Sequence, residues 1–178
     1  IMTPMGPIYQ DDDFDGVTAQ EIAVFIGPNY RRYLSVFKMM RDSGHNFSFN
    51  WSAFFFNYCF LFYRKLYRPA IVVMSLVAML FIPRLMYSSE SIKYFLNVYM
   101  QVPVDYDLGL LGNLGTLISI INIVQLAMMF VVASFSDRLY YNHVVREIKK
   151  LRSAAPSTLS QDQYLTMLAF NGRTNPRM

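Results

Sequence analysis

Two long apolar stretches dominate the pattern of hydrophobic and polar positions along the chain. Residues 69–87 contain one charge, Arg84, near their far end, and residues 108–136 contain none. A bilayer core about 30 Å thick requires roughly 20 apolar residues in a helix. We therefore expect two membrane-spanning helices joined by an outer loop, residues 88–107, with Pro83 weakening the last turn of the first helix. Apolar positions inside the loop recur at the spacing of a short surface helix: Ile92, Phe95, Leu96 and Tyr99.

An aromatic stretch, WSAFFFNYCFLFY, occupies residues 51–63 and is too short to be a third span. At about 1.5 Å per residue such a helix reaches only about 20 Å. Aromatic side chains favour the headgroup level, so residues 51–68 are expected to be either interfacial or re-entrant. A single helix over residues 51–87 is disfavoured, because it would place three cations in hydrocarbon at roughly 2.5–3.5 kcal/mol each.

An acidic lead, residues 1–17, contains the run DDDFDG, which matches the first half of an EF-hand calcium loop. The twelfth position of that loop requires a bidentate Glu, and here Ile22 occupies it. The capping box Thr18-Ala-Gln-Glu21 instead predicts that the run precedes the start of a helix.

Two amphipathic helices are expected within residues 18–50, on the cytoplasmic side. The first should end at Gly27-Pro28. The second should begin after Asn29, a plausible N-cap, and end at Gly44.

Beyond the second span, residues 137–153 are predicted to continue as a basic cytoplasmic helix. Its cations suit anionic lipid, at about 1 kcal/mol each near the surface, and an acidic protein partner is the alternative. Residues 154–178 are interpreted as a linker and tail that include a short docking helix capped by Ser160. His143 and Glu147 are interpreted as an ordinary helical pair, since no third metal ligand lies nearby in the sequence.

Composition and charge support this arrangement. Apolar residues make up 54% of the chain and charged residues 16%, against about 25% charged residues in soluble domains. We predict an all-α membrane protein, a two-helix transmembrane hairpin preceded by short amphipathic helices and an aromatic interfacial or re-entrant segment. Basic residues flank the hairpin at both ends, whereas the loop contains only Lys93. By the positive-inside tendency, both termini are expected to be cytoplasmic.

The order of these parts resembles a known family. The segment DDFDGV leads into AQEIAVFIGPNYRRYLSVFKMM, and then come FNWSAFFFNYCFLFYRKLY, the two spans and RLYYNHVVREIKKL. Over about residues 11–152 the chain resembles the bacterial integral membrane family catalogued as domain of unknown function 2628. Members of that family typically read Gly-Pro where this chain has Asn57-Tyr58. The resemblance implies a small multi-pass protein of the bacterial cytoplasmic (inner) membrane and implies no activity.

Candidate chemistry is sparse. Cys59 is the only cysteine, which excludes an intrachain disulfide and a CxxC metal site. The sequence contains no recognisable Ser-His-Asp set, phosphate-binding loop or intramembrane carboxylate dyad, so we expect no enzymatic activity, catalytic residue, metal or cofactor.

Two groups of residues are candidates for contacts. The first is predicted to contact lipid or a protein partner, although an aromatic belt with snorkelling cations is the simpler interpretation. Its members are Trp51, Tyr63, Arg64, Lys65, Arg68, Arg138, Arg146, Lys149 and Lys150. The second group lies within the second span and is predicted to make helix–helix contacts. Its members are Asn113, Ser119, Asn122 and Gln125.

These features favour a non-enzymatic accessory or scaffold subunit of a larger membrane complex. One alternative is a homo-oligomeric channel or transporter component, in which Asn122 and Gln125 face inward. Another is an anionic-lipid-binding protein of the membrane surface, such as a stress sensor. Expected partners are anionic membrane lipids and either a larger complex or further copies of the chain, with no nucleic acid.

Overall fold

The computed structural model describes residues 2–3, 6–44, 47–156 and 159–172. A two-residue antiparallel pair, β1 (Met2–Thr3) and β2 (Gly6–Pro7), precedes the helices. The described helices are α1 (Ala19–Ile26), α2 (Tyr30–Ser43), α3 (Trp51–Tyr63), α4 (Tyr67–Met100), α5 (Leu108–Ala154) and α6 (Gln161–Gly172). The predicted fold class is confirmed: the chain is helical, and two of its helices are long and apolar enough to cross a membrane as a hairpin.

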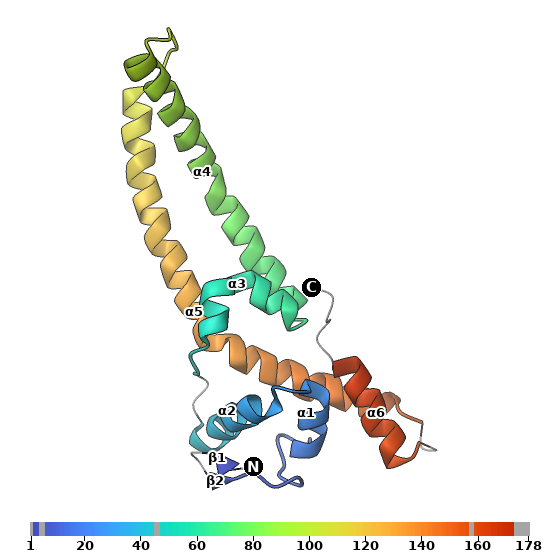
Figure 1. The fold of residues 1–178 in the computed structure, drawn as a ribbon. Coiled ribbons are helices and arrows are strands. Elements are labelled where there is room, and N and C mark those ends of the chain that lie inside the picture. The colour runs from blue at the N-terminus through green and yellow to red at the C-terminus, as the bar shows by residue number, and fades with distance from the viewer. Residues whose placement is uncertain (1, 4–5, 45–46, 157–158, 173–178) are drawn as a thin grey trace.

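The helices form two regions (Figure 1). The hairpin, which consists of α4 and residues 108–135 of α5, extends away from the rest of the molecule. The bundle consists of α1, α2, α6 and residues 136–154 of α5. Between them lies α3, which contacts both α4 and α5. We call the level of α3 the junction.

A change of direction in α5 separates the two regions: the helix runs beside α4, then turns beneath α3 and crosses the bundle (Figure 1). At this turn its carbonyl groups accept hydrogen bonds from the chain that leads into α3. The N–H of Ser48 donates to the carbonyl of Ser134 at 3.2 Å, and the N–H of Asn50 donates to that of Ala133 at 3.0 Å. The Ser134 hydroxyl donates to the Phe130 carbonyl at 2.7 Å, a local bond that tends to bend helices. These competing bonds account for the turn.

Asp137 holds the junction together from inside. It is 1% exposed, and its carboxylate accepts hydrogen bonds from the Asn50 amide at 2.7 Å and the Ser48 hydroxyl at 3.1 Å. The carbonyl oxygen of the Asn50 side chain in turn accepts from the backbone N–H groups of Ser52 and Ala53, which caps α3. Buried polar groups are tolerated when they are paired in this way, and the start of α3 is thereby fixed to the turn of α5.

Aromatic rings from α2 and α5 form the centre of the bundle. Phe37 is fully buried, and its ring meets Tyr141 edge-on with the ring centroids 4.9 Å apart. Tyr33 meets Tyr140 in the same manner at 5.0 Å. Such contacts add about 0.5–1.5 kcal/mol to the effect of burial. Apolar residues recur at helical spacing along this face of α2, and Tyr33, Leu34 and Phe37 are all buried.

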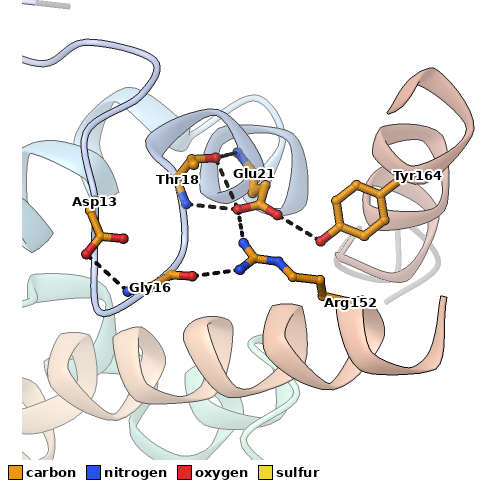
Figure 2. Close-up of polar contacts among 6 residues, drawn as sticks. All are labelled: Asp13, Gly16, Thr18, Glu21, Arg152 and Tyr164. Carbon is orange, nitrogen blue, oxygen red and sulfur yellow. Dashed lines mark hydrogen bonds and ion pairs between the residues drawn. The ribbon is translucent and has the colours of Figure 1, made fainter. Parts of the chain in front are cut away.

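The predicted capping box at the start of α1 is confirmed, and its carboxylate also joins three helices. The Thr18 hydroxyl accepts from the N–H of Glu21, and the Glu21 carboxylate accepts from the N–H of Thr18. The same carboxylate accepts from Arg152 on α5 at 2.5 Å and from the Tyr164 hydroxyl on α6 at 2.8 Å (Figure 2). Burial alone would raise the pKa of Glu21, but these bonds outweigh it and hold the pKa below its ordinary value.

The aspartates that precede α1 make contacts within the fold. Asp13 accepts a hydrogen bond from the N–H of Gly16 at 3.2 Å and closes a turn (Figure 2). Asp15 accepts from the Tyr141 hydroxyl at 2.6 Å. Burial raises the pKa of Tyr141, and the Asp15 carboxylate raises it further. The acidic run thus attaches the chain before α1 to α5.

The end of α4 corrects one sequence-based prediction. An outer loop with a short surface helix was expected over residues 88–107. Instead the residues of that helix belong to α4, which continues to Met100, and the connection comprises only residues 101–107. No proline or glycine follows Pro83 before the helix ends, so nothing in the local sequence stops it. Arg84 therefore lies near the middle of α4 rather than near its end.

The segment α3 is a separate helix, as predicted, with a kink at Asn57. Asn57 has φ 43° and ψ −117°, a conformation that favours glycine. This is the position at which the family pattern has glycine. The Asn57 side chain is buried, and its oxygen has no hydrogen-bond partner among the described residues. The kink is present although the residue that would adopt this conformation most easily is absent.

The predicted docking helix is present as α6. The Ser160 hydroxyl accepts a hydrogen bond from the N–H of Gln163 at 3.3 Å, and Leu168 is fully buried. At the other end, Gly172 lies against α1 so closely that a Cβ atom there would be 1.9 Å from the Phe25 carbonyl oxygen. Only a glycine fits this contact.

Candidate functional site

A pocket of about 690 Å³ lies at the junction, between the start of α4, the second half of α5 and the end of α6. Its apolar lining includes Tyr67, Pro69 and Leu139. Its polar and charged lining residues are Lys65, Arg68, Asn142, His143, Arg146, Glu147 and Asn171. We call it the junction pocket.

The turn between α3 and α4 supplies two of the cations. Leu66 is buried, and its N–H donates to the Leu61 carbonyl at 2.9 Å, which anchors the turn to the core. Lys65, with φ 59°, and Arg68 lie on either side of this anchor and line the pocket. The ammonium group of Lys65 donates to the Asn171 carbonyl at 2.9 Å, so α6 helps to position it.

Four further polar groups come from α5. Asn142 and Arg146 are four residues apart, as are His143 and Glu147, so both pairs occupy adjoining positions on one side of the helix. Burial lowers the pKa of His143, and the charges of Arg146 and Lys65 lower it further, although Glu147 opposes them. A largely neutral His143 leaves three permanent cations and one carboxylate around the pocket, which favours an anionic ligand.

The pocket lies where the hairpin would leave a bilayer. Arg68 and Pro69 are at the start of α4, and Leu139 follows the end of the charge-free stretch of α5 by three residues. Within the described residues no group of three or more His, Cys, Asp or Glu side chains could hold a metal ion. The arrangement is suited to binding a phosphate group rather than to coordinating a metal.

Three members of the predicted lipid or partner contact group lie together in the junction pocket: Lys65, Arg68 and Arg146. Arg138 is half-buried, with its guanidinium 5.4 Å from the centre of the Tyr141 ring. Lys149 and Lys150 are exposed on α5 outside the pocket.

The aromatic members of this group lie on α3. Trp51 is 64% exposed and stacks on Phe55, with the ring centroids 5.9 Å apart. Tyr63 is exposed beside the guanidinium of Arg64, which lies 5.3 Å from the centre of its ring. Both rings are exposed on α3.

Arg64 corrects another prediction, because it is buried instead of facing lipid. Its guanidinium donates to the Tyr33 hydroxyl at 2.6 Å and lies 4.9 Å from the centre of the Tyr140 ring. Cation–π contacts of this kind partly replace hydration. Since Tyr33 and Tyr140 are distant in sequence, nothing in the local pattern distinguished Arg64 from its exposed neighbours.

The polar residues of the second span separate into two pairs. Asn122 and Gln125 contact the facing helix, since both side-chain oxygens accept from one nitrogen of Arg84, at 2.5 and 2.9 Å. Ser119 instead donates to the Gly115 carbonyl of its own helix, and Asn113 is exposed. The structure therefore places Asn122 and Gln125 at the contact between α4 and α5.

Sequence reasoning missed Arg84 as a contact because the predicted end of the helix placed it near the membrane surface. The apolar spacing after Pro83, which continues to Tyr99, was the signal that the helix extends further. Asn142 and Asn171 of the pocket carried no recognisable signal, because α6 approaches α4 only in the folded chain.

Comparison with known proteins identifies the family and nothing more specific. The chain belongs to the family described as "Protein of unknown function (DUF2628)", whose family model matches residues 19–146. No curated protein and no solved structure matches the chain. The match covers α1 to α4 and most of α5, and therefore includes the hairpin and most of the junction pocket.

Proposed function

We propose that this family member is a non-enzymatic membrane protein that binds the phosphate headgroup of an anionic phospholipid in the junction pocket. The observation that carries the proposal is the convergence of Lys65, Arg68 and Arg146 on one pocket of about 690 Å³. Basic pockets at the cytoplasmic ends of transmembrane helices suit anionic headgroups, because several cations lie where the phosphate groups lie.

The position of the pocket along the hairpin supports a lipid as the ligand. Apolar residues of the pocket, among them Tyr67, Pro69 and Leu139, adjoin the start of the exposed apolar surface of α4. Acyl chains could follow this surface while the headgroup occupies the basic end. In this proposal the bundle lies in the bacterial cytoplasm, in agreement with the excess of Lys and Arg outside the hairpin.

The test is lipid binding by the purified protein in a mild detergent. Phosphatidylglycerol and phosphatidylcholine are titrated in turn, and bound lipid is counted by native mass spectrometry. We expect Arg68→Gln and Arg146→Gln each to weaken phosphatidylglycerol binding by about fivefold, since each cation contributes about 1 kcal/mol. Added salt should weaken the binding further.

Lys150→Gln is the matched control, because Lys150 is an exposed cation of α5 that does not line the pocket. It should leave the affinity for phosphatidylglycerol unchanged. An equal loss in this variant would mean that the overall charge attracts the lipid, and equal binding of both lipids would exclude a headgroup site.

His143 offers a second measurement inside the pocket. Its pKa is lowered by burial and by the neighbouring cations. A bound phosphate group would oppose those cations, so the pKa of His143 should rise when phosphatidylglycerol is added and should not respond to phosphatidylcholine. Titration of the imidazole by NMR distinguishes these outcomes.

A role as a subunit of a larger membrane complex is the second proposal, favoured by the uncovered surface of the hairpin. Large apolar side chains such as Met79 and Ile123 are each 70% exposed. Lipid alone could cover these side chains, so they do not distinguish a protein partner from lipid. The polar environment of Arg84 does.

A further inference from the structure

We propose that Arg84, Asn122 and Gln125 form a binding site for a carboxylate on a transmembrane helix of a different protein. The inference goes beyond headgroup binding and uses a different part of the molecule, but it also requires the hairpin to cross a bilayer. We call these three residues the Arg84 cluster.

The Arg84 cluster is polar but carries no negative charge. One guanidinium nitrogen of Arg84 donates to the side-chain oxygens of Asn122 and Gln125, at 2.5 and 2.9 Å. The other two guanidinium nitrogens have no hydrogen-bond partner among the described residues. Arg84 also forms no ion pair with any described carboxylate. The nearest carboxylate on the same helix, Glu90, is paired with Lys93 at 2.7 Å. The cluster thus positions a cation and leaves its charge unbalanced.

The guanidinium is directed away from the loop end of the hairpin. The register of the two helices shows this. Tyr87 of α4 lies opposite Gly115 of α5, since its ring is 3.6 Å from the position that a Cβ atom would occupy at Gly115. Since α4 and α5 run antiparallel, Arg84, three residues before Tyr87, faces about Ile118. Asn122 and Gln125 lie four and seven residues further along α5, or about 6 and 10 Å at about 1.5 Å per residue.

This depth selects the class of ligand. A lone arginine near a membrane surface normally extends its side chain towards the phosphate groups. Here the two amides hold the guanidinium in the opposite direction, within the charge-free stretch of α5 that begins at Leu108. Phosphate groups do not reside at that depth, whereas a carboxylate on a neighbouring transmembrane helix does, and intramembrane charges commonly pair with one another.

A second copy of this chain does not supply the carboxylate. Residues 69–89 and residues 108–135 contain no Asp or Glu, so a copy inserted in the same direction offers none at the level of the cluster. The partner is therefore a different protein with an acidic residue near the middle of a transmembrane helix.

Defined peptides test the proposal without knowledge of the natural partner. Three Leu/Ala transmembrane peptides carry Glu at the centre, Gln at the centre, or Glu near one end. The protein is reconstituted with each peptide in phosphatidylcholine bilayers, and association is measured by energy transfer from a donor on Cys59, which is the only cysteine and is exposed. We expect the central Glu peptide to bind at least about tenfold more tightly than the other two.

Substitutions then assign the preference to the cluster. Arg84→Gln should remove the difference between the Glu and Gln peptides, and Arg84→Lys, which keeps the charge, should retain part of it. Asn122→Leu combined with Gln125→Leu should weaken the preference, because the guanidinium is no longer held at this depth. Lys150→Gln, which changes an exposed cation of the bundle, should leave the preference unchanged.

Several results would overturn the proposal. Equal binding of the central Glu and Gln peptides would show that charge pairing does not operate. Equal binding of the end-positioned Glu peptide would place the interaction at the surface. If unlabelled copies of the protein displaced the central Glu peptide from the labelled protein, the site would be one of self-association. Because the bilayers contain no anionic lipid, none of these results depends on headgroup binding in the junction pocket.

Discussion

The bundle and the hairpin are both helical and both rich in apolar residues, but they use those residues in opposite ways. In the bundle, Phe37 and Ile148 are fully buried against neighbouring helices. In the hairpin, Met79 and Ile123 each remain 70% exposed, and only 6% of the most apolar part of α4 is buried. The bundle therefore obtains its stability from contacts inside the chain, whereas the hairpin has a large apolar surface that no other described part of the chain covers.

Truncation of one large aromatic residue in each region tests this difference most strongly. Phe37→Ala should lower the free energy of unfolding by about 3–5 kcal/mol, because it leaves a cavity among buried rings. Phe81→Ala should lower it by less than about 1 kcal/mol, because Phe81 is 52% exposed. Denaturant unfolding in mild detergent, followed by near-ultraviolet circular dichroism, gives both values. Equal losses would contradict the division into two regions.

The same glycine substitution should have opposite effects in the two regions. Gly172→Ala places a Cβ atom 1.9 Å from the Phe25 carbonyl oxygen, so α6 must shift, at a cost of about 1–3 kcal/mol. Gly112→Ala in the hairpin meets no atom within 4 Å and should stabilise the helix by up to about 1 kcal/mol. Hydrogen exchange of α6 should increase in the first variant only. Unchanged protection of α6 would mean that this contact does not dock the helix.

Acid should loosen the bundle through Glu21 without a corresponding effect in the hairpin. Because the folded pKa of Glu21 is held below its ordinary value of 4.5, its ionised form stabilises the fold above that pH. This stabilisation is lost as the pH falls from 4.5 through the lower folded pKa. Its size should be less than about 1 kcal/mol, because the Arg152 side chain is 46% exposed.

Glu21→Gln supplies the comparison for this pH dependence. Between about pH 5 and 3 the stability of the variant should change less steeply than that of the original chain. Parallel curves would show that other carboxyl groups account for the acid response. The protection of the α4 amides against hydrogen exchange, measured in detergent, should stay constant over this range.

A further modest effect is expected at the junction between the two regions. Asn57→Gly should raise the free energy of unfolding by roughly 1 kcal/mol, since glycine adopts φ 43° without strain. The change also removes a buried oxygen that has no hydrogen-bond partner among the described residues. Asn57→Ala serves as the control, because it removes the same oxygen but retains the strain. Similar gains in both variants would assign the effect to the oxygen.

Local features of the fold could be predicted from the sequence because neighbouring residues determine them. The Thr18–Glu21 capping box, the end of α1 at Gly27 and the end of α2 at Gly44 all depend on contacts within one or two turns. The end of α4 was predicted incorrectly, since the first span was expected to end at residue 87 with its last turn weakened by Pro83, whereas the helix continues to Met100. Helices commonly end at proline, but here the apolar face of α4 continues past it.

The candidate sites depend on contacts between distant segments. Lys65 and Arg146 were both named as possible lipid contacts, but no spacing indicated that they line one pocket with Asn171. Asn122 and Gln125 were named as helix contacts, whereas their partner Arg84 was assigned to the membrane surface. Arg64 was placed with the exposed cations and proved to be buried.

By itself, the sequence determined where most of the helices begin and end, and it determined the two stretches long enough to cross a membrane. Periodicity and length set these properties locally. Only the tertiary structure decided which groups from distant segments meet. These contacts produce the turn of α5, the burial of Arg64 against Tyr33 and Tyr140, the junction pocket and the Arg84 cluster. Each of these joins side chains dozens of residues apart. Such contacts arise from how the helices pack, which the spacing of residues along one helix does not specify.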